Sequence, residues 1–133
     1  MRAPCSYDYA IVRVVPRVER GEFINAGVIV SCQTQDFLAA QIELDETRLL
    51  ALDAVVDLEA IRLNLASIPM ICQGGAQAGP IGALTQRERF HWLVAPRSTI
   101  IQTSPVHSGR CGDPAAVLRH LLATMVRMPT GGT

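Results

Sequence analysis

The sequence predicts an α+β fold, namely a mainly antiparallel four-stranded sheet with helices packed on one face. Two observations lead to this fold class. Runs rich in β-branched residues fill the first third of the chain. Later segments repeat apolar residues every three or four positions, as helices do, with one more strand-like run between them. The chain has 133 residues, of which 49% are hydrophobic, so we expect a single domain over residues 1–133.

Four segments are typical of β-strands. The first covers residues 7–15, where one face is apolar and Pro16 ends the run. The next two, 27–32 and 37–44, are close enough in sequence to form an antiparallel hairpin. A fourth strand is expected at 98–104.

Each predicted helix begins at a recognisable capping residue. The caps are Asp45, Asp57, Thr85 with Glu88, and Asp113 with Pro114. The buried face of the last helix is expected to comprise Leu118, Leu121, Leu122 and Met125. Residues 73–82 and 105–112 are predicted loops, and the tail at about 129–133 is expected to be flexible.

Composition and charge exclude several classes of function. The chain has 12 arginines, no lysine and 12 acidic residues, so its net charge is zero. A general nucleic-acid binder needs excess positive charge to neutralise phosphates, so nucleic acid is not an expected partner. No apolar run approaches the ~20 residues that span a bilayer. The first residues lack the pattern of a secretory signal, so we expect a cytoplasmic protein without a membrane partner.

The four cysteines, Cys5, Cys32, Cys72 and Cys111, are far apart in the sequence. No C-x-x-C motif or paired histidine spacing accompanies them, which excludes the common structural zinc signatures. The sequence therefore predicts no metal and no cofactor. Reduced thiols are expected in the cytoplasm, with Cys32 and Cys72 acting as small core residues.

The first polar stretch lies between two apolar strands at residues 13–27. Arg13 is expected inside a strand, where a buried charge needs a partner such as Glu19 or Glu22. A solvated connection with an internal ion pair is one interpretation. In the other, this stretch holds an anion or ligand at the sheet edge. The residues proposed for that role are Arg13, Arg17, Arg20, Glu22 and Asn25.

The second polar stretch, residues 87–109, combines arginines, hydroxyls and histidines. Arg97 and Ser98 are expected to converge with His107 on a small polar pocket. Thr99 and Gln102 are also proposed as ligand-binding residues of this stretch. The alternative is structural: apolar neighbours pack and the hydroxyls satisfy turns.

No segment has the pattern of a catalytic site. Ser104, His107 and Asp113 are the only compact trio of nucleophile, base and acid, and nothing around them resembles a nucleophile elbow. Nucleotide-binding glycine loops and H-E-x-x-H are absent from the sequence. We therefore assign no catalytic residues, and the sequence favours a role other than catalysis.

Three segments together resemble a bacterial family catalogued as domain of unknown function 3037 (DUF3037): residues 7–32, 89–109 and 113–126. The resemblance implies a family signature at Arg13, Pro16, Arg20, Glu22, Asn25, Gly27, Arg89, Phe90, Ser98, Thr99, Gln102, His107 and Gly109. It implies no reaction. Members of the family tend to be encoded near a kinase resembling the serine/threonine kinase toxins, which implies a partner or accessory role.

Three functional hypotheses remain open from the sequence. The first is a binding or accessory module with a protein partner such as a kinase. The second is a small phosphate- or nucleotide-binding protein, or an enzyme, with an Arg/Ser/His pocket. The third is a homo-oligomeric structural protein whose exposed strand edge pairs with its copy. The first needs only a surface, whereas the second needs residues 13–27 and 97–109 to lie side by side.

Overall fold

An antiparallel sheet forms the middle layer of the protein in the computed structural model, which describes residues 5–129. The strands are β1 (Cys5–Val14), β2 (Ile24–Cys32), β3 (Phe37–Ile42), β4 (Ile101–Thr103) and β5 (His107–Cys111). Their order is β3-β2-β1-β4, and β5 pairs with β1 as well. β4 lies along the second half of β1, and β5 along its first half. The predicted α+β class with an antiparallel sheet is confirmed.

The strand β5 is a correction, because residues 105–112 were predicted to form a loop and the sheet to have four strands. Serine and glycine give this segment little intrinsic strand preference, so its conformation depends on pairing with β1. Gly109 lies opposite Tyr7, and a Cβ atom at Gly109 would come within 2.6 Å of Cζ in that ring. The glycine therefore leaves room for the tyrosine.

The helices begin where the capping residues predict. They are α1 (Glu46–Leu52), α2 (Leu58–Gln73), α3 (Gln86–Val94) and α4 (Pro114–Leu121), and α4 continues into the π-helical turn η4 (Leu122–Val126). The side chains of Asp45, Asp57 and Asp113 each accept a backbone hydrogen bond, and Thr85 and Glu88 form the predicted capping box. Short 3₁₀ segments occupy η1 (Val18–Arg20), η2 (Gln33–Gln35) and η3 (Ala76–Ala83). The last of these lies largely within the predicted loop at 73–82.

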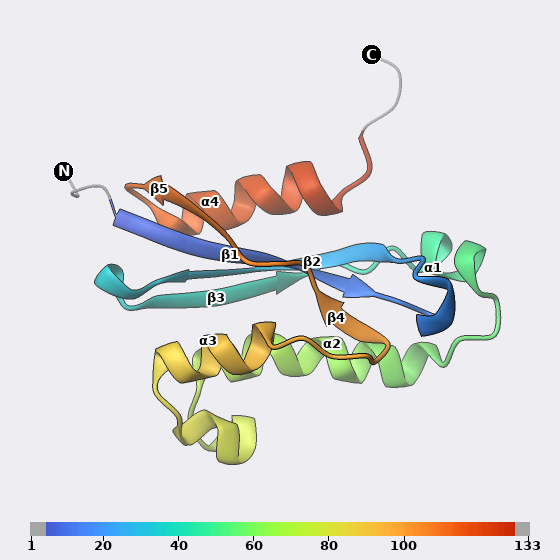
Figure 1. Ribbon diagram of the computed structural model, residues 1–133, viewed down its shortest axis with the longest axis horizontal. Coiled ribbons are helices and arrows are strands. Elements are labelled where there is room, and N and C mark those ends of the chain that lie inside the picture. Colours follow the sequence, from blue (N-terminus) through green and yellow to red (C-terminus); the bar gives the residue numbers. More distant parts are fainter. Residues whose placement is uncertain (1–4, 130–133) are drawn as a thin grey trace.

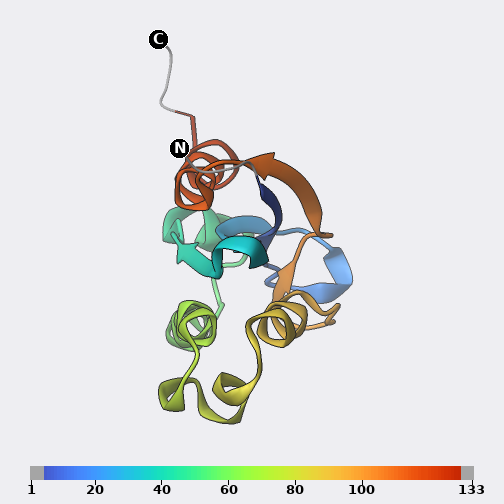
Figure 2. The same cartoon turned by 90° about the vertical axis from the view of Figure 1, so that its left-hand side faces the viewer.

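Helices cover both faces of the sheet, so the expectation of a single helical layer was wrong. Figure 1 shows α2 and α3 on one side of the strands and α4 on the other, and the rotated view in Figure 2 agrees. The reason is that the central strands are apolar on both sides. Val12 and Ile29 enter the core beneath α2, whereas Ile11 and Val28 pack against α4.

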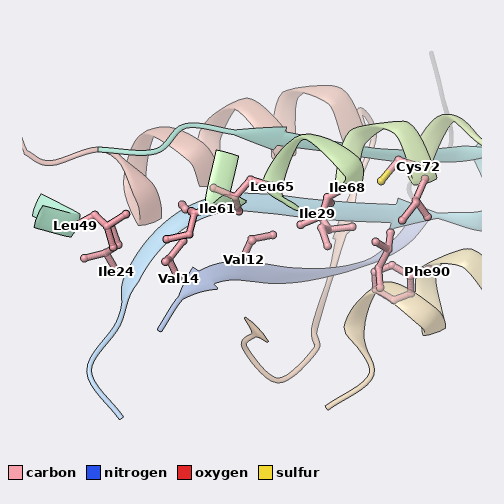
Figure 3. Packing of buried hydrophobic residues seen from close by; sticks show 13 residues of the cluster. Val12, Val14, Ile24, Ile29, Leu49, Ile61, Leu65, Ile68, Cys72 and Phe90 are labelled. Atoms are coloured by element: carbon pink, nitrogen blue, oxygen red, sulfur yellow. The ribbon is translucent and has the colours of Figure 1, made fainter. Parts of the chain in front are cut away.

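The larger core lies between the sheet and α2 (Figure 3). The apolar residues of α2 that recur every three or four positions supply it with Ile61, Leu65, Ile68 and Cys72, all buried. In the smaller core, Leu118, Leu121 and Leu122 are buried as predicted, but Met125 is 44% exposed. In the part of the chain that the structure covers, no helix is long and apolar enough to cross a membrane. Most of the predicted flexible tail lies outside the described residues.

Candidate functional site

Two contacts hold the first part of the β1–β2 connection in place. The backbone N–H of Val15 donates to the carbonyl of Ile100, at 2.7 Å, which fastens the connection to the segment before β4. Arg17 forms an ion pair with Asp53, with Nε 3.2 Å from Oδ2, and Asp53 is only 9% exposed. The η1 turn then ends at Gly21, whose φ of 69° is left-handed. These contacts leave Val18 at the surface, 42% exposed.

Arg97 folds back over the end of α3 because Pro96 prevents the helix from continuing. Its guanidinium carbon lies 4.4 Å from the centroid of the Trp92 ring. Its Nη atoms donate to the carbonyls of Trp92 and Leu93, which are among the last carbonyls of the helix. The positive charge of Arg97 is therefore used to cap a helix.

The residues between Arg97 and β4 form a compact turn. Thr99 Oγ1 donates to the carbonyl of Ile101 at 2.8 Å, and Gln102 Nε2 donates to the carbonyl of Thr99 at 2.8 Å. These two bonds hold the backbone in the shape that presents Ile100 to solvent, 42% exposed. Ser98 is exposed beside them.

A hollow of about 580 Å³ lies between α2, the end of α3 and β4. Its wall includes Arg97, Ser98, Thr99 and Gln102 from the second polar stretch. A second hollow of about 460 Å³ follows the β1–β2 connection and is lined by Arg17, Glu19 and Asp53. Val18, Asn64 and Ile100 line both hollows. We call the two together the groove.

The groove therefore joins residues from the two polar stretches, but its exposed surface is largely apolar. Val18, Trp92 and Ile100 are 42%, 41% and 42% exposed along it, and Val55 is 78% exposed at its far end. Neighbouring apolar side chains that remain this accessible are typical of interaction surfaces. Asn64 and Ser67 of α2 also line the groove but were not predicted to do so, because their only signal is a three-residue spacing on the polar side of the helix.

Arg13 and Asn25 lie on the other face of the sheet. Arg13 alternates with Val12 and Val14, which enter the core beneath α2, so its side chain is on the α4 side. Asn25 is its neighbour on β2, after a bulge, and donates through Nδ2 to the carbonyl of Met125 at 2.8 Å. Gln102 is the neighbour of Arg13 on β4. Asn25, Arg13 and Gln102 are therefore neighbours on the three adjacent strands β2, β1 and β4.

Arg13 lacks the carboxylate partner that the sequence analysis expected. Glu22 pairs instead with Arg20, with Nε 2.6 Å from Oε1. The guanidinium of Arg13 lies 4.2 Å from the Phe23 ring centroid, and no ion pair is found for it within residues 5–129. Its Nε and the Oδ1 of Asn25 are buried without hydrogen-bond partners there. A donor and an acceptor on neighbouring strands are thus unsatisfied.

Arg20 and Glu22 form a local pair at the surface, with exposed fractions of 61% and 47%. The hydrogen bond from Arg20, and then its charge, lower the pKa of Glu22. Both side chains are exposed, so solvent screens the pair and it contributes little to stability.

His107 lies away from the groove. It is the partner of Tyr9 in the β1–β5 register, with ring centroids 5.4 Å apart, and is exposed. Arg13, whose partner on the β4 side is Gln102, lies four residues further along β1, which corresponds to about 13 Å. The structure therefore brings Arg97, Ser98, Thr99 and Gln102 together but does not bring His107 to them.

The trio of Ser104, His107 and Asp113 does not assemble into a catalytic arrangement. Ser104 is 4% exposed; its Oγ accepts from the backbone N–H of Ile11 at 2.9 Å and donates to the carbonyl of Pro105. Asp113 caps α4 through the N–H of Ala115. The serine hydroxyl therefore bonds the backbone of β1 and of Pro105, at the point where β4 ends and the chain continues to β5.

A family model described as "Protein of unknown function (DUF3037)" matches residues 9–126. The chain belongs to the DUF3037 family. The match includes the groove and the Arg13 region of this DUF3037 chain, whereas Cys5 precedes it. No curated protein and no solved structure matches the chain significantly. The family description names no activity.

Proposed function

We propose that this DUF3037 protein is a non-catalytic binding module whose groove receives an extended, apolar segment of a partner protein. The observation that carries the proposal is the row of exposed apolar side chains, Val18, Trp92 and Ile100, in a hollow of about 580 Å³. Burying such surface on association releases roughly 25 cal/mol per Å², although ordering the partner offsets part of it.

The free edge of β4 supports an extended partner rather than a helical one. β4 ends the strand order, so among residues 5–129 only one of its sides pairs within the sheet. The hydrogen bonds from Val15 N–H to the carbonyl of Ile100 and from Ser104 N–H to the carbonyl of Ile11 show which residue pairs of β1 and β4 are hydrogen-bonded. Every second pair is bonded in this way. By that alternation the peptide groups of Gln102 face β1, and the N–H groups of Ile101 and Thr103 point outward. An added strand pairs with such groups in β-augmentation.

The arginines of the groove already have bonding partners, which favours a protein segment over a phosphate as its ligand. Arg17 is paired with Asp53, and Arg97 already donates to helix carbonyls and stacks on Trp92. A phosphate site uses guanidinium groups that are free to form bidentate bonds. Here Arg17 and Arg97 are instead bonded to neighbouring groups at the edges of an apolar surface.

We further propose that the partner is a serine/threonine-type kinase encoded near the gene. The resemblance of the chain to DUF3037 supports this choice, because members tend to be encoded beside such a kinase. The groove supports the kind of contact, namely a segment of the kinase in extended conformation with apolar side chains pointing toward Ile100 and Trp92.

Ile100→Glu is expected to weaken the complex with this kinase by at least about tenfold, since a charge would enter the desolvated centre of the contact. The measurement is the dissociation constant between the purified kinase and the full chain, by titration calorimetry. Met125→Glu is the matched control, because Met125 has almost the same exposed fraction, 44%, but lies on the α4 side. It should bind like wild type.

Thermal unfolding of both variants checks that each is folded. Equal weakening by Ile100→Glu and Met125→Glu would place the contact elsewhere and contradict the groove. A wild-type chain that binds no kinase but forms a dimer sensitive to Ile100→Glu would favour a second copy as occupant, and would also contradict the proposal.

A second candidate, binding of a small anion, is favoured by one observation: Arg13 is partly buried and no carboxylate pairs with it in residues 5–129. An unpaired charge at a partly buried site is costly, and an anion would relieve that cost. Asn25 and Gln102 flank it on the neighbouring strands.

Inorganic phosphate at 10 mM is therefore expected to raise the melting temperature by roughly 4 °C if the dissociation constant is about 1 mM. Arg13→Gln should abolish the rise, whereas Arg110→Gln, an exposed arginine on β5, should retain it. Sodium chloride at equal ionic strength controls for general screening. A rise that persists in Arg13→Gln, or none in wild type, rules this candidate out.

A further inference from the structure

The thiols of Cys5 and Cys32 meet at one end of the sheet, although 27 positions separate them in the sequence. Cys5 begins β1 and Cys32 ends β2, and their Sγ atoms lie 2.8 Å apart. Both residues are buried, with exposed fractions of 7% and 0%. The S–S bond of a disulfide is about 2.05 Å, so bonding needs an approach of less than about 1 Å.

The hydrogen bonds around the pair distinguish the two sulfurs. Cys32 Sγ donates to Cys5 Sγ, and Gln35 Nε2 donates to the same Cys5 sulfur at 3.3 Å. Gln35 Nε2 also contacts the carbonyl of Gly112, at 3.2 Å, so it is held from two sides. Cys5 Sγ thus accepts a hydrogen bond from each of these groups, and Cys32 Sγ also contacts Thr34 Oγ1 at 3.5 Å. Cys5 keeps a small exposed surface whereas Cys32 has none, so Cys5 is the sulfur that a small oxidant reaches first.

We propose that Cys5 and Cys32 are a reactive dithiol that a hydroperoxide oxidises to a disulfide between β1 and β2. The Cys5 sulfur attacks one peroxide oxygen and the O–O bond breaks, giving a sulfenic acid and one molecule of water. The Cys32 sulfur then attacks the sulfenic sulfur, the S–S bond forms and a second water leaves. Two thiols lose two protons and two electrons, and one hydrogen peroxide becomes two waters.

The other two cysteines provide internal comparisons. Cys72 lies in the core beneath α2, where burial raises the pKa of its thiol to about 12, so it should stay unreactive. Cys111 lies opposite Cys5 in the β1–β5 register and is the competing partner by position. The proposal rests on the 2.8 Å contact between the Cys5 and Cys32 sulfurs, and the experiment must separate these two pairings.

The cross-link would close the hairpin that contains the whole β1–β2 connection, including Arg17 and Val18 of the groove. A closed loop of this size reduces the freedom of the unfolded chain, which stabilises the folded state relative to it. Oxidation should therefore raise the melting temperature by roughly 10 °C. This effect does not depend on what the groove binds.

The test is peptide mapping of the reduced full chain after treatment with hydrogen peroxide. The chain has no lysine, so trypsin cuts after arginine and places the four cysteines in four different peptides: 3–13, 21–48, 63–87 and 111–119. We expect a mass loss of two hydrogens, two of four thiols left under denaturing conditions, and a linked pair of peptides 3–13 and 21–48.

Cys111→Ser should keep both the link and the rise in melting temperature, and Cys32→Ser should lose both. Cys5→Ser serves if Cys32→Ser does not fold, and the map of the wild type needs no variant. A link between 3–13 and 111–119, or four thiols that survive a peroxide excess, overturns the proposal.

Discussion

Leu65→Ala is expected to lower the free energy of unfolding by about 2–5 kcal/mol, the largest effect that we anticipate for a single truncation here. Leu65 lies in the middle of α2, is 2% exposed and packs in the larger core with Ile29 and Val12. Removing its side chain loses the transfer free energy and leaves a cavity that the rigid sheet cannot close. Urea denaturation monitored by circular dichroism measures the change.

Leu63→Ala is the matched control, because it makes the same truncation two residues away on the same helix. Leu63 is 67% exposed, so its replacement should change stability by less than about 0.5 kcal/mol. Similar losses in the two variants would mean that α2 does not face the sheet as described.

Arg89→Met is expected to lower the free energy of unfolding by about 2 kcal/mol, because Arg89 donates hydrogen bonds to backbone carbonyls in the last turn of α2. Its Nη1 donates to the carbonyls of Ile71 and Cys72, and its Nε donates to the carbonyl of Leu84. Gly74 makes room for it: its φ of 76° ends the helix, and a Cβ there would lie 3.0 Å from the guanidinium carbon. Methionine keeps most of the volume but donates nothing.

The control is Arg87→Met, at an exposed position in the first turn of α3, the helix that also carries Arg89. Its stability should stay within about 0.5 kcal/mol of wild type, and the difference between the two variants isolates the capping of α2. Equal stabilities, measured by thermal and urea unfolding, would show that solvent satisfies those carbonyls equally well.

The candidate site was only partly predictable. Arg97, Ser98, Thr99 and Gln102 were singled out and do line the groove, because they follow a helix that Pro96 ends. Asn64 and Trp92 were not assigned to it, since their part depends on how α2 and α3 pack against β4. His107 was assigned to the same pocket but is paired with Tyr9 at the other end of β1.

The starts of the helices were determined by the sequence itself. A capping side chain such as Asp57 or Thr85 bonds the backbone three residues later, so its information is local. The apolar stripe of α2 is local in the same sense, because its period is that of the helix.

Only the tertiary structure decided the second helical layer, the strand β5 and the meeting of Cys5 with Cys32. Each depends on contacts between residues distant in sequence, which no local pattern encodes. A strand such as β2, apolar on both faces, requires cover on each side, but it does not specify which helix supplies it. That choice follows from the order of the strands and the lengths of their connections.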